Sequence, residues 1–237
     1  RLRQEARALL RPVVEAAAND MELADLLPRV LDRISPEQDG PPVPLLSCTD
    51  VFRPEGISNP SVLSLVHLAL DEGTAGGALS ATGLMAEGWE VYASADSLYV
   101  AQSSRWWWWG WGPLDLRTHI HRFSLAGSST TYRSSGAVDG WLLNSFSMGE
   151  WEGTLRLATT DTDSWWGTTD EAGETPANNV FCLREQGAEL RLVGAARGIA
   201  PGEQIQAARF LGPRGFLVTF LQVDPLFTLD LSDPAAP

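Results

Sequence analysis

The feature that most constrains the fold of this chain is a repeated pair of strand-like segments. One type occurs four times, starting at residues 63, 118, 178 and 224, with spacings of 55, 60 and 46. A second type starts at residues 98, 155 and 216, with spacings of 57 and 61. Two independent segment families with a similar period indicate a repeat protein. Their members read LSLVHLAL, THIHRFSL, NNVFCLRE and DPLFTLDL for the first type, and LYVA, LRLA and FLVT for the second.

The surrounding sequence predicts a mainly β chain. After residue 44, short apolar runs alternate with clusters of Gly, Ser, Asp and Pro, which is typical of many short strands. The shortest spacing, 46 residues, fits one four-stranded propeller blade, and inserts at 102–116 and 161–177 lengthen the others. Residues 45–237 therefore predict a partial β-propeller, with about three four-stranded blades plus the first strand of another. Because propellers close with about four to eight blades, we expect the remaining blades to come from another segment or chain.

The N-terminal part has a different character. Residues 1–34 predict a helical segment, because apolar residues recur at positions i, i+3, i+4 and i+7. Within it, Asn19 or Asp20 would cap a second helical stretch, in which Pro28 either introduces a kink or starts a new turn of helix. Residues 35–44, SPEQDGPPVP, predict a linker, since Pro-Pro and Asp-Gly favour turned or extended chain.

Charge and composition exclude several function classes. The net charge is −13, which argues against nucleic acid and anionic membranes as main partners. All 17 basic residues are Arg, which excludes a Schiff-base lysine and a Walker-type phosphate loop. No run approaches the ~18 apolar residues of a membrane span. Cys48 and Cys182 form no zinc or redox signature, so they are either unrelated buried thiols or one long-range disulfide.

Tryptophan is concentrated in two inserts. Nine of the ten tryptophans lie between residues 106 and 166. Four consecutive tryptophans on a strand cannot all face one core, because alternate side chains point to opposite sides. The cluster is either an aromatic platform for a sugar, peptide or protein partner, or a plug that covers the propeller face. The candidate binding residues are Arg105, Trp106, Trp107, Trp108, Trp109, Trp111, Trp165 and Trp166.

Two weaker patterns concern metal binding. His119 and His121 would face the same side of a strand, a spacing that can hold a metal or leave both histidines hydrogen-bonded. Neither face of this strand is uniformly apolar, which predicts a place near an edge or along a channel. Asp161, Asp163 and Asp170 lie in one acidic loop, but an EF-hand would need Gly and Glu where the sequence has Trp166 and Ala172. We therefore expect no resident cofactor, with a looser calcium site at this loop as the alternative to a solvated acidic loop.

Several long motifs resemble those of a known family. SLYVAQSSRWWWWGWG (97–112), GWLLNSFSMGEWEGTLRLATT (140–160) and FLVTFLQVDPLFTLDLSDP (216–234) are similar, in this order along the chain, to bacterial and archaeal secreted proteins that carry a C-terminal β-propeller distantly related to WD40 repeats. The resemblance covers residues 45–237. It implies a propeller and a secreted, periplasmic or cell-surface location. It implies no established activity and no catalytic residues.

Three functions remain open at this stage. The sequence has no GxSxG elbow or comparable nucleophile motif, which favours a non-catalytic role. The first hypothesis is a binding or scaffolding module that takes a protein or glycan through a propeller face and the Trp-rich insert. The second is a propeller hydrolase or lyase with an acidic, calcium-assisted channel site. The third is a structural subunit of a larger envelope assembly. Fold analogy does not choose among them, because propellers host many unrelated functions.

Overall fold

The computed structural model describes residues 2–20, 27–31, 33–35, 38–54, 61–68, 79–103, 117–126, 129–161, 176–220 and 225–237. These residues form many strands and, among those described, one α-helix, so the predicted mainly β fold class is confirmed. The chain divides into two compact units. The first comprises Arg1–Phe52 and Ser64–Gly83, and the second comprises Arg53–Leu63 and Leu84–Pro237.

The first unit begins with the single α-helix, α1 (Leu2–Asp20). Its apolar stripe lies in solvent, with Leu9, Val13 and Val14 more than half exposed. Short strand pairs follow instead of the predicted second helical stretch and linker. The pairs are β1 (Arg29–Val30) with β4 (Val43–Pro44), and β2 (Arg33–Ser35) with β3 (Gln38–Asp39).

The helical prediction for residues 1–34 is therefore wrong beyond the first helix in the described residues, and residues 35–44 contribute to hairpins. Pro28 explains the change, because proline lacks the amide hydrogen that a continuing helix needs. The unit also contains a 3₁₀ turn, η1 (Cys48–Asp50), and a three-stranded sheet of β5 (Val51–Phe52), β7 (Leu79–Leu84) and β6 (Leu63–Leu68).

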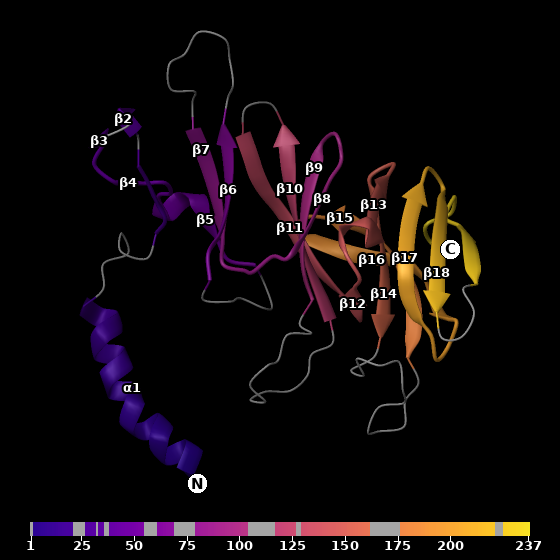
Figure 1. The fold of residues 1–237 in the computed structure, drawn as a ribbon, viewed down its shortest axis with the longest axis horizontal. Coiled ribbons are helices and arrows are strands. Elements are labelled where there is room, and N and C mark those ends of the chain that lie inside the picture. Colours follow the sequence, from indigo (N-terminus) through magenta and orange to yellow (C-terminus); the bar gives the residue numbers. More distant parts are fainter. Residues whose placement is uncertain are drawn as a thin grey trace. The chain divides into compact units, whose positions relative to one another are not determined.

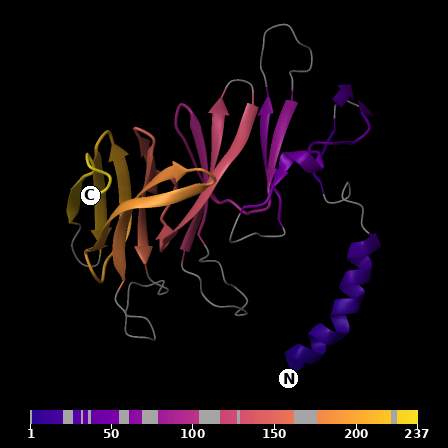
Figure 2. The same cartoon turned by 180° about the vertical axis from the view of Figure 1, so that it is seen from behind.

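The second unit consists of three successive antiparallel meanders, which Figures 1 and 2 show side by side. The first meander is β8 (Glu90–Ala93), β9 (Ser97–Ser103), β10 (Arg117–Ala126) and β11 (Ser129–Asp139). The second is β13 (Met148–Trp151), β14 (Thr154–Asp161), β15 (Ala177–Gln186) and β16 (Glu189–Ile199), preceded by β12 (Trp141–Leu142) and a 3₁₀ turn, η2 (Ser145–Ser147). The third is β17 (Gln204–Leu211), β18 (Arg214–Phe220) and β19 (Leu226–Asp230). One parallel bridge, Ser135↔Glu189, joins the first two meanders.

Both segment families fall on equivalent strands. LYVA, LRLA and FLVT lie in β9, β14 and β18, the second strand of each meander. THIHRFSL, NNVFCLRE and the last segment lie along β10, β15 and β19, the third strand of each. The repeat is confirmed, but the two segment families are the second and third strands of each meander. The final segment, DPLFTLDL, is therefore the third strand of the third meander. A period read from sequence carries no information about where each blade begins.

Neighbouring meanders pack against each other through two apolar cores. Leu155, Leu157 and Phe181 of the second meander pack with Tyr99, Ile120 and other buried residues of the first. Ala158 and Val180, on the opposite face of the second meander, pack with Ile205 and Leu217 of the third. The second meander is thus buried on both sides, which explains why its strands read as nearly unbroken apolar and small residues. The sequence predicts that β10 lies near an edge or along a channel. It is not an edge strand, because it pairs with both β9 and β11, and a place along a channel stays a prediction.

Candidate binding surface

Most of the candidate binding residues lie outside the described residues. These are Arg105, Trp106, Trp107, Trp108, Trp109, Trp111, Trp165 and Trp166, together with the acidic-loop residues Asp163 and Asp170. The aromatic platform therefore stays a prediction. The described candidates are His119 and His121 on β10, and Asp161 at the exposed end of β14.

His121 is a buried, neutral histidine. It is 3% exposed, and its Nδ1 lies 2.6 Å from the Oγ of Ser135 on the paired strand β11. The Ser135 Oγ also lies 2.8 Å from the hydroxyl of Tyr132. Burial, assisted by neighbouring His119, lowers the pKa of His121 to about 4. Among the described residues no group of three or more His, Cys, Asp or Glu side chains is arranged to hold a metal ion.

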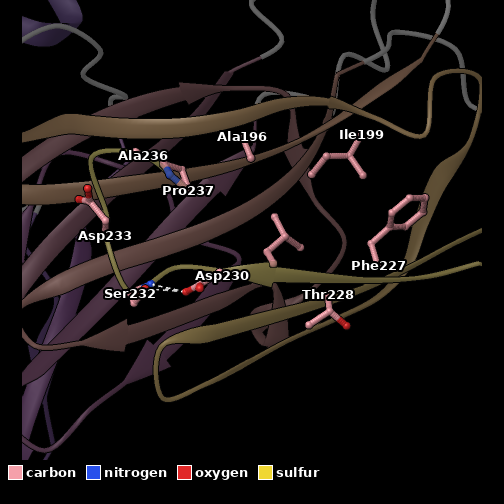
Figure 3. Close-up of a pocket in the computed structure, with 10 residues that line it drawn as sticks. Ala196, Ile199, Phe227, Thr228, Asp230, Ser232, Asp233, Ala236 and Pro237 are labelled. Atoms are coloured by element: carbon pink, nitrogen blue, oxygen red, sulfur yellow. Dashed lines mark hydrogen bonds between the residues drawn. The ribbon is translucent and has the colours of Figure 1, made fainter.

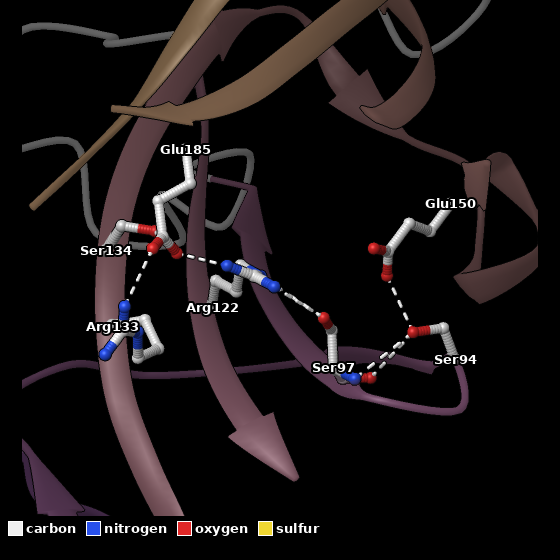
Figure 4. Close-up of polar contacts among 7 residues, drawn as sticks. All are labelled: Ser94, Ser97, Arg122, Arg133, Ser134, Glu150 and Glu185. Carbon is white, nitrogen blue, oxygen red and sulfur yellow. Dashed lines mark hydrogen bonds and ion pairs between the residues drawn. The ribbon is translucent and has the colours of Figure 1, made fainter. Parts of the chain in front are cut away.

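A polar cluster crosses the junction between the first and second meanders (Figure 4), and we call it the junction cluster. Glu185 of β15 is its centre, accepting hydrogen bonds from Arg122 of β10, from Arg133 at 3.2 Å and from Ser134 at 3.2 Å on β11. Arg122 also donates to the Ser97 Oγ at 3.0 and 3.2 Å. The junction cluster therefore fastens one meander to the next through charged groups.

The junction cluster also includes Glu150 of β13. Ser94 donates a 2.6 Å hydrogen bond to Glu150 of β13, and the backbone amide of Glu150 donates to the Tyr92 hydroxyl at 3.0 Å. Burial and nearby Glu150 raise the pKa of Tyr99 to about 12. Burial alone raises the pKa of Glu185, but the hydrogen bonds and charge of Arg122 outweigh it, so the net pKa is lowered. The charged forms of Arg122 and Glu185 are thus both favoured, and each is committed to a partner, which suits fastening rather than proton transfer.

A pocket of about 440 Å³ lies beside the third meander (Figure 3), and we call it the edge pocket. Ile199 of β16 and Phe227 of β19 lie on facing sides, and Asp230 and Asp233 lie at its polar end. Ser232 donates hydrogen bonds to Asp230 at 3.0 Å from its amide and 2.6 Å from its hydroxyl. The lining residues are Ala196, Ile199, Phe227, Thr228, Leu229, Asp230, Ser232, Asp233, Ala236 and Pro237.

Strand β19, which forms one wall of the edge pocket, pairs on one side only. Its register with β18 runs from Val218↔Leu226 to Arg214↔Asp230, and no described residue pairs with its other side. In the other two meanders, the equivalent edges of β10 and β15 are occupied by β11 and β16. Within the described residues, the backbone on the free side of β19 therefore has no paired strand, whereas the equivalent backbone of the other two meanders does. The edge pocket lies beside this free side.

Sequence reasoning did not identify the edge pocket. Its apolar side comes from Phe227 and Leu229, which alternate with the exposed residues Thr228 and Asp230, and this alternation was a visible signal of a strand with one buried face. This alternation does not show which strand β19 pairs with, because strand partners are long-range contacts. Both cysteines are free in this structure, Cys182 buried and Cys48 exposed.

Two known proteins resemble parts of this chain. Both are archaeal and are described only as uncharacterized. One, from Methanocaldococcus jannaschii, is 41% identical over 103 residues, which is 44% of this chain and 15% of the relative. The other, from Archaeoglobus fulgidus, is 43% identical over 121 residues, 51% of this chain and 17% of the relative. The matches thus span less than a fifth of each relative's length.

Two further findings complete the comparison. Within the described part of the chain, no helix combines the length and apolarity needed to cross a membrane. A family model described as a beta propeller domain matches residues 4–237, which includes nearly all of α1 as well as every meander. The chain therefore belongs to the beta propeller domain family.

Proposed function

We propose that this chain is a non-catalytic binding and scaffolding module that holds an extended polypeptide, from a further segment of the protein or from another chain, along the free side of β19. The observation that supports the proposal most directly is the edge pocket, an apolar depression of about 440 Å³ beside a one-sided strand. A free strand side offers a row of backbone donors and acceptors, and adjacent pockets select the side chains of an added strand.

The other two meanders indicate what such a partner looks like. Both third strands are followed by a fourth strand of 11 residues, β11 and β16. On β11, Gly136 lies so close to β16 that an added Cβ would be 2.4 Å from the Leu190 carbonyl oxygen. At the next junction the residue equivalent to Gly136 is Ala196 of β16, which pairs with Val180 as Gly136 pairs with Ile120. The partner is therefore an extended segment that passes Ala196 and places apolar residues over Ile199 and Phe227.

Fluorescently labelled peptides with the sequences of Ser129–Asp139 and Glu189–Ile199 test the proposal by fluorescence polarisation against the intact chain. We expect saturable binding of at least one peptide and none of a scrambled peptide of equal composition. Ala196→Arg, which fills the edge pocket, should abolish binding. Ala137→Arg, an exposed substitution on β11, is the matched control and should bind normally. Equal binding of the true and scrambled peptides, or full binding to Ala196→Arg, contradicts the proposal.

The Trp-rich segment provides the second contact surface in this proposal. Tryptophan is strongly enriched among the residues that dominate binding energy, and its ring also stacks on sugars and peptides. Replacing Trp106, Trp107, Trp108 and Trp109 by Ala should weaken binding of a protein or glycan partner while leaving the melting temperature unchanged. Intrinsic fluorescence titration with cell-wall oligosaccharides and with the labelled peptides measures this, and unchanged affinities for all of them count against the platform.

The proposed location is outside the cytoplasm, as the family resemblance implies, either secreted, periplasmic or at the cell surface. Fractionation of cells that produce the protein, with an antibody against the chain, tests this. Recovery in the cytoplasmic fraction alone contradicts it.

A further inference from the structure

We propose that Arg156 and Arg184, at the junction between the second and third meanders, form a binding site for a single carboxylate group. The two arginines project from adjacent strands on the same face of the second meander. Arg156 of β14 lies opposite Cys182 of β15, and Arg184 lies two residues further along β15, opposite Thr154. They are therefore diagonal neighbours across the strand pair, at a separation that long side chains bridge.

Arg156 is a buried cation. The residue is 3% exposed, and its guanidinium donates to two backbone carbonyls, Gly149 O at 3.3 Å through Nε and Gly212 O at 2.5 Å through Nη1. It also lies over the Phe210 ring, 5.2 Å from the centroid. These contacts leave Nη2 with no hydrogen-bond partner within the described part of the protein. Burial lowers the pKa of Arg156, and this effect outweighs that of the nearby groups that raise it, Glu150 among them.

Arg184 makes no ion pair with a described carboxylate, although Glu152 lies in the lining of the same pocket. The Arg184 Nε donates to the Thr154 hydroxyl at 2.8 Å. The other ion pairs of this unit show that acids are used elsewhere, at Glu185, Glu189 and Asp139. The two positive charges repel each other, and among the described residues the buried guanidinium of Arg156 has only neutral partners, two backbone carbonyls and the Phe210 ring. A bound anion would relieve both effects.

The space for this anion is present. A pocket of about 40 Å³, which we call the arginine pocket, lies between the second and third meanders. Since one water needs about 10–15 Å³, the arginine pocket has room for the two oxygens of one carboxylate and little more. Its lining residues are Trp151, Glu152, Thr154, Arg156, Arg184, Leu231, Ser232 and Pro234.

A carboxylate fits this site better than other anions do. It is planar and offers two oxygens, which match the free Nη2 of Arg156 and the fork of Arg184 in charge-assisted hydrogen bonds. Glu152 is also in the lining, and the chain's net charge is −13, so a multiply charged anion such as phosphate is opposed at short and long range. The ligand is either a small free carboxylate or the terminal carboxylate of a polypeptide, which share the same recognition chemistry.

Thermal unfolding of the intact chain at pH 7.5 tests the site, with sodium acetate replacing sodium chloride at constant ionic strength. We expect a saturable rise in melting temperature, about 5–10 °C at a concentration near 100 times Kd. Arg184→Met, at an exposed residue, should fold and lose the response. Arg191→Met, at an exposed arginine of β16 that lies outside the arginine pocket, is the matched control and should keep it.

Further ligands separate the sources of the carboxylate. A larger response to N-acetyl-trialanine acid than to acetate, with none to its C-terminal amide, identifies a polypeptide terminus. Equal responses to acetate and the peptide acid identify a free carboxylate, and both results support the site. No saturable response to acetate, an undiminished response in Arg184→Met, or a stronger response to inorganic phosphate overturns the proposal. None of these ligands requires the free side of β19, so failure here is distinguishable from failure of the proposed function.

Discussion

Replacing Glu185 by Gln should destabilise the fold more than any exposed charge substitution. Glu185 and Arg122 have side chains 20% and 21% exposed, and Glu185 receives hydrogen bonds from three residues of the first meander. Gln keeps the shape but removes the charge, which leaves the half-buried guanidinium of Arg122 without its counter-ion. Exposed ion pairs contribute about 0–1 kcal/mol, whereas breaking a buried pair costs about 3–5 kcal/mol. At this intermediate exposure we expect a loss of about 2 kcal/mol.

Urea denaturation, followed by circular dichroism at pH 7, measures this loss. For a chain of this size, about 2 kcal/mol corresponds to a fall in melting temperature of about 4–8 °C. Glu189→Gln is the matched control, because Glu189 pairs with Arg191 at 2.5 Å while both side chains remain more than half exposed. We expect the control to change the free energy of unfolding by about 0.5 kcal/mol or less. If Glu185→Gln costs no more than Glu189→Gln, the junction cluster does not fasten the meanders.

The pH dependence provides an independent check. The pKa of Glu185 is lower in the folded chain than its ordinary value of 4.5, because the contacts with Arg122 outweigh burial. Its ionised form therefore stabilises the fold above the unfolded pKa, and this contribution disappears as the pH falls through the folded pKa. The free energies of unfolding of wild type and Glu185→Gln should converge as the pH falls below 4.5. A gap that stays constant to low pH contradicts an ionic origin.

Three further substitutions test other parts of the second unit. The pKa of His121 is about 4 in the folded chain, against an ordinary value of 6.5, so the unfolded chain binds an extra proton between these pH values. The free energy of unfolding of wild type should therefore fall by about 3 kcal/mol from pH 6.5 to 4. In urea titrations over this range, His121→Gln should lose that component of the fall, and a fall as steep as in wild type contradicts the prediction. Gly136→Ala places a Cβ 2.4 Å from the Leu190 carbonyl oxygen and should cost about 1–3 kcal/mol. Gly153→Ala, with open space but a φ of 70°, isolates the cost of backbone strain, about 1 kcal/mol; a smaller loss at Gly136 than at Gly153 would show that the two meanders separate easily.

The strands could be predicted from the sequence because burial on two sides leaves a local signal. LRLATT of β14 and VFCL of β15 contain few exposed positions, since meanders pack on both of their faces. Such runs recur at a regular period and so identify the blades. The end of α1 at Asp20 could not be predicted from the apolar stripe alone, because the stripe continues to Leu31 while Pro28 lies within it.

The polar sites could not be predicted for a different reason. Glu185 and Arg122 are 63 residues apart, and Arg156 reaches Gly212 across 56 residues, so neither contact leaves a local pattern. His121 looked like half of a metal site because spacing shows which side a residue faces and not what lies there. In the structure its neighbour is Ser135. The Trp-rich segment is the opposite case, a strong local signal whose packing lies outside the described residues.

The internal repeat also predicts how the junction cluster could be replaced. Aligning the third strands places Arg122 at the fifth position of its segment, where the next segment has Cys182. Glu185 occupies the eighth position of NNVFCLRE, where the segment of the third meander, DPLFTLDL, has Leu231. Cys182 and Leu231 are both buried, at 0% and 3% exposure. The chain therefore uses an ionic pair at one junction and apolar residues at the equivalent positions of the next.

This equivalence gives a prediction for the double variant Arg122→Met, Glu185→Leu. Replacing a buried ion pair by apolar residues of similar volume is often neutral, whereas removing one partner is costly. Ser97 is fully buried and would lose its bonds to Arg122, so we expect recovery to be partial. The double variant should lose about 1 kcal/mol, less than either single variant at about 2 kcal/mol, in a double-mutant cycle measured by urea denaturation. Losses that simply add would show that Arg122 and Glu185 act independently, and that the fastening of the first two meanders lies in their apolar core alone.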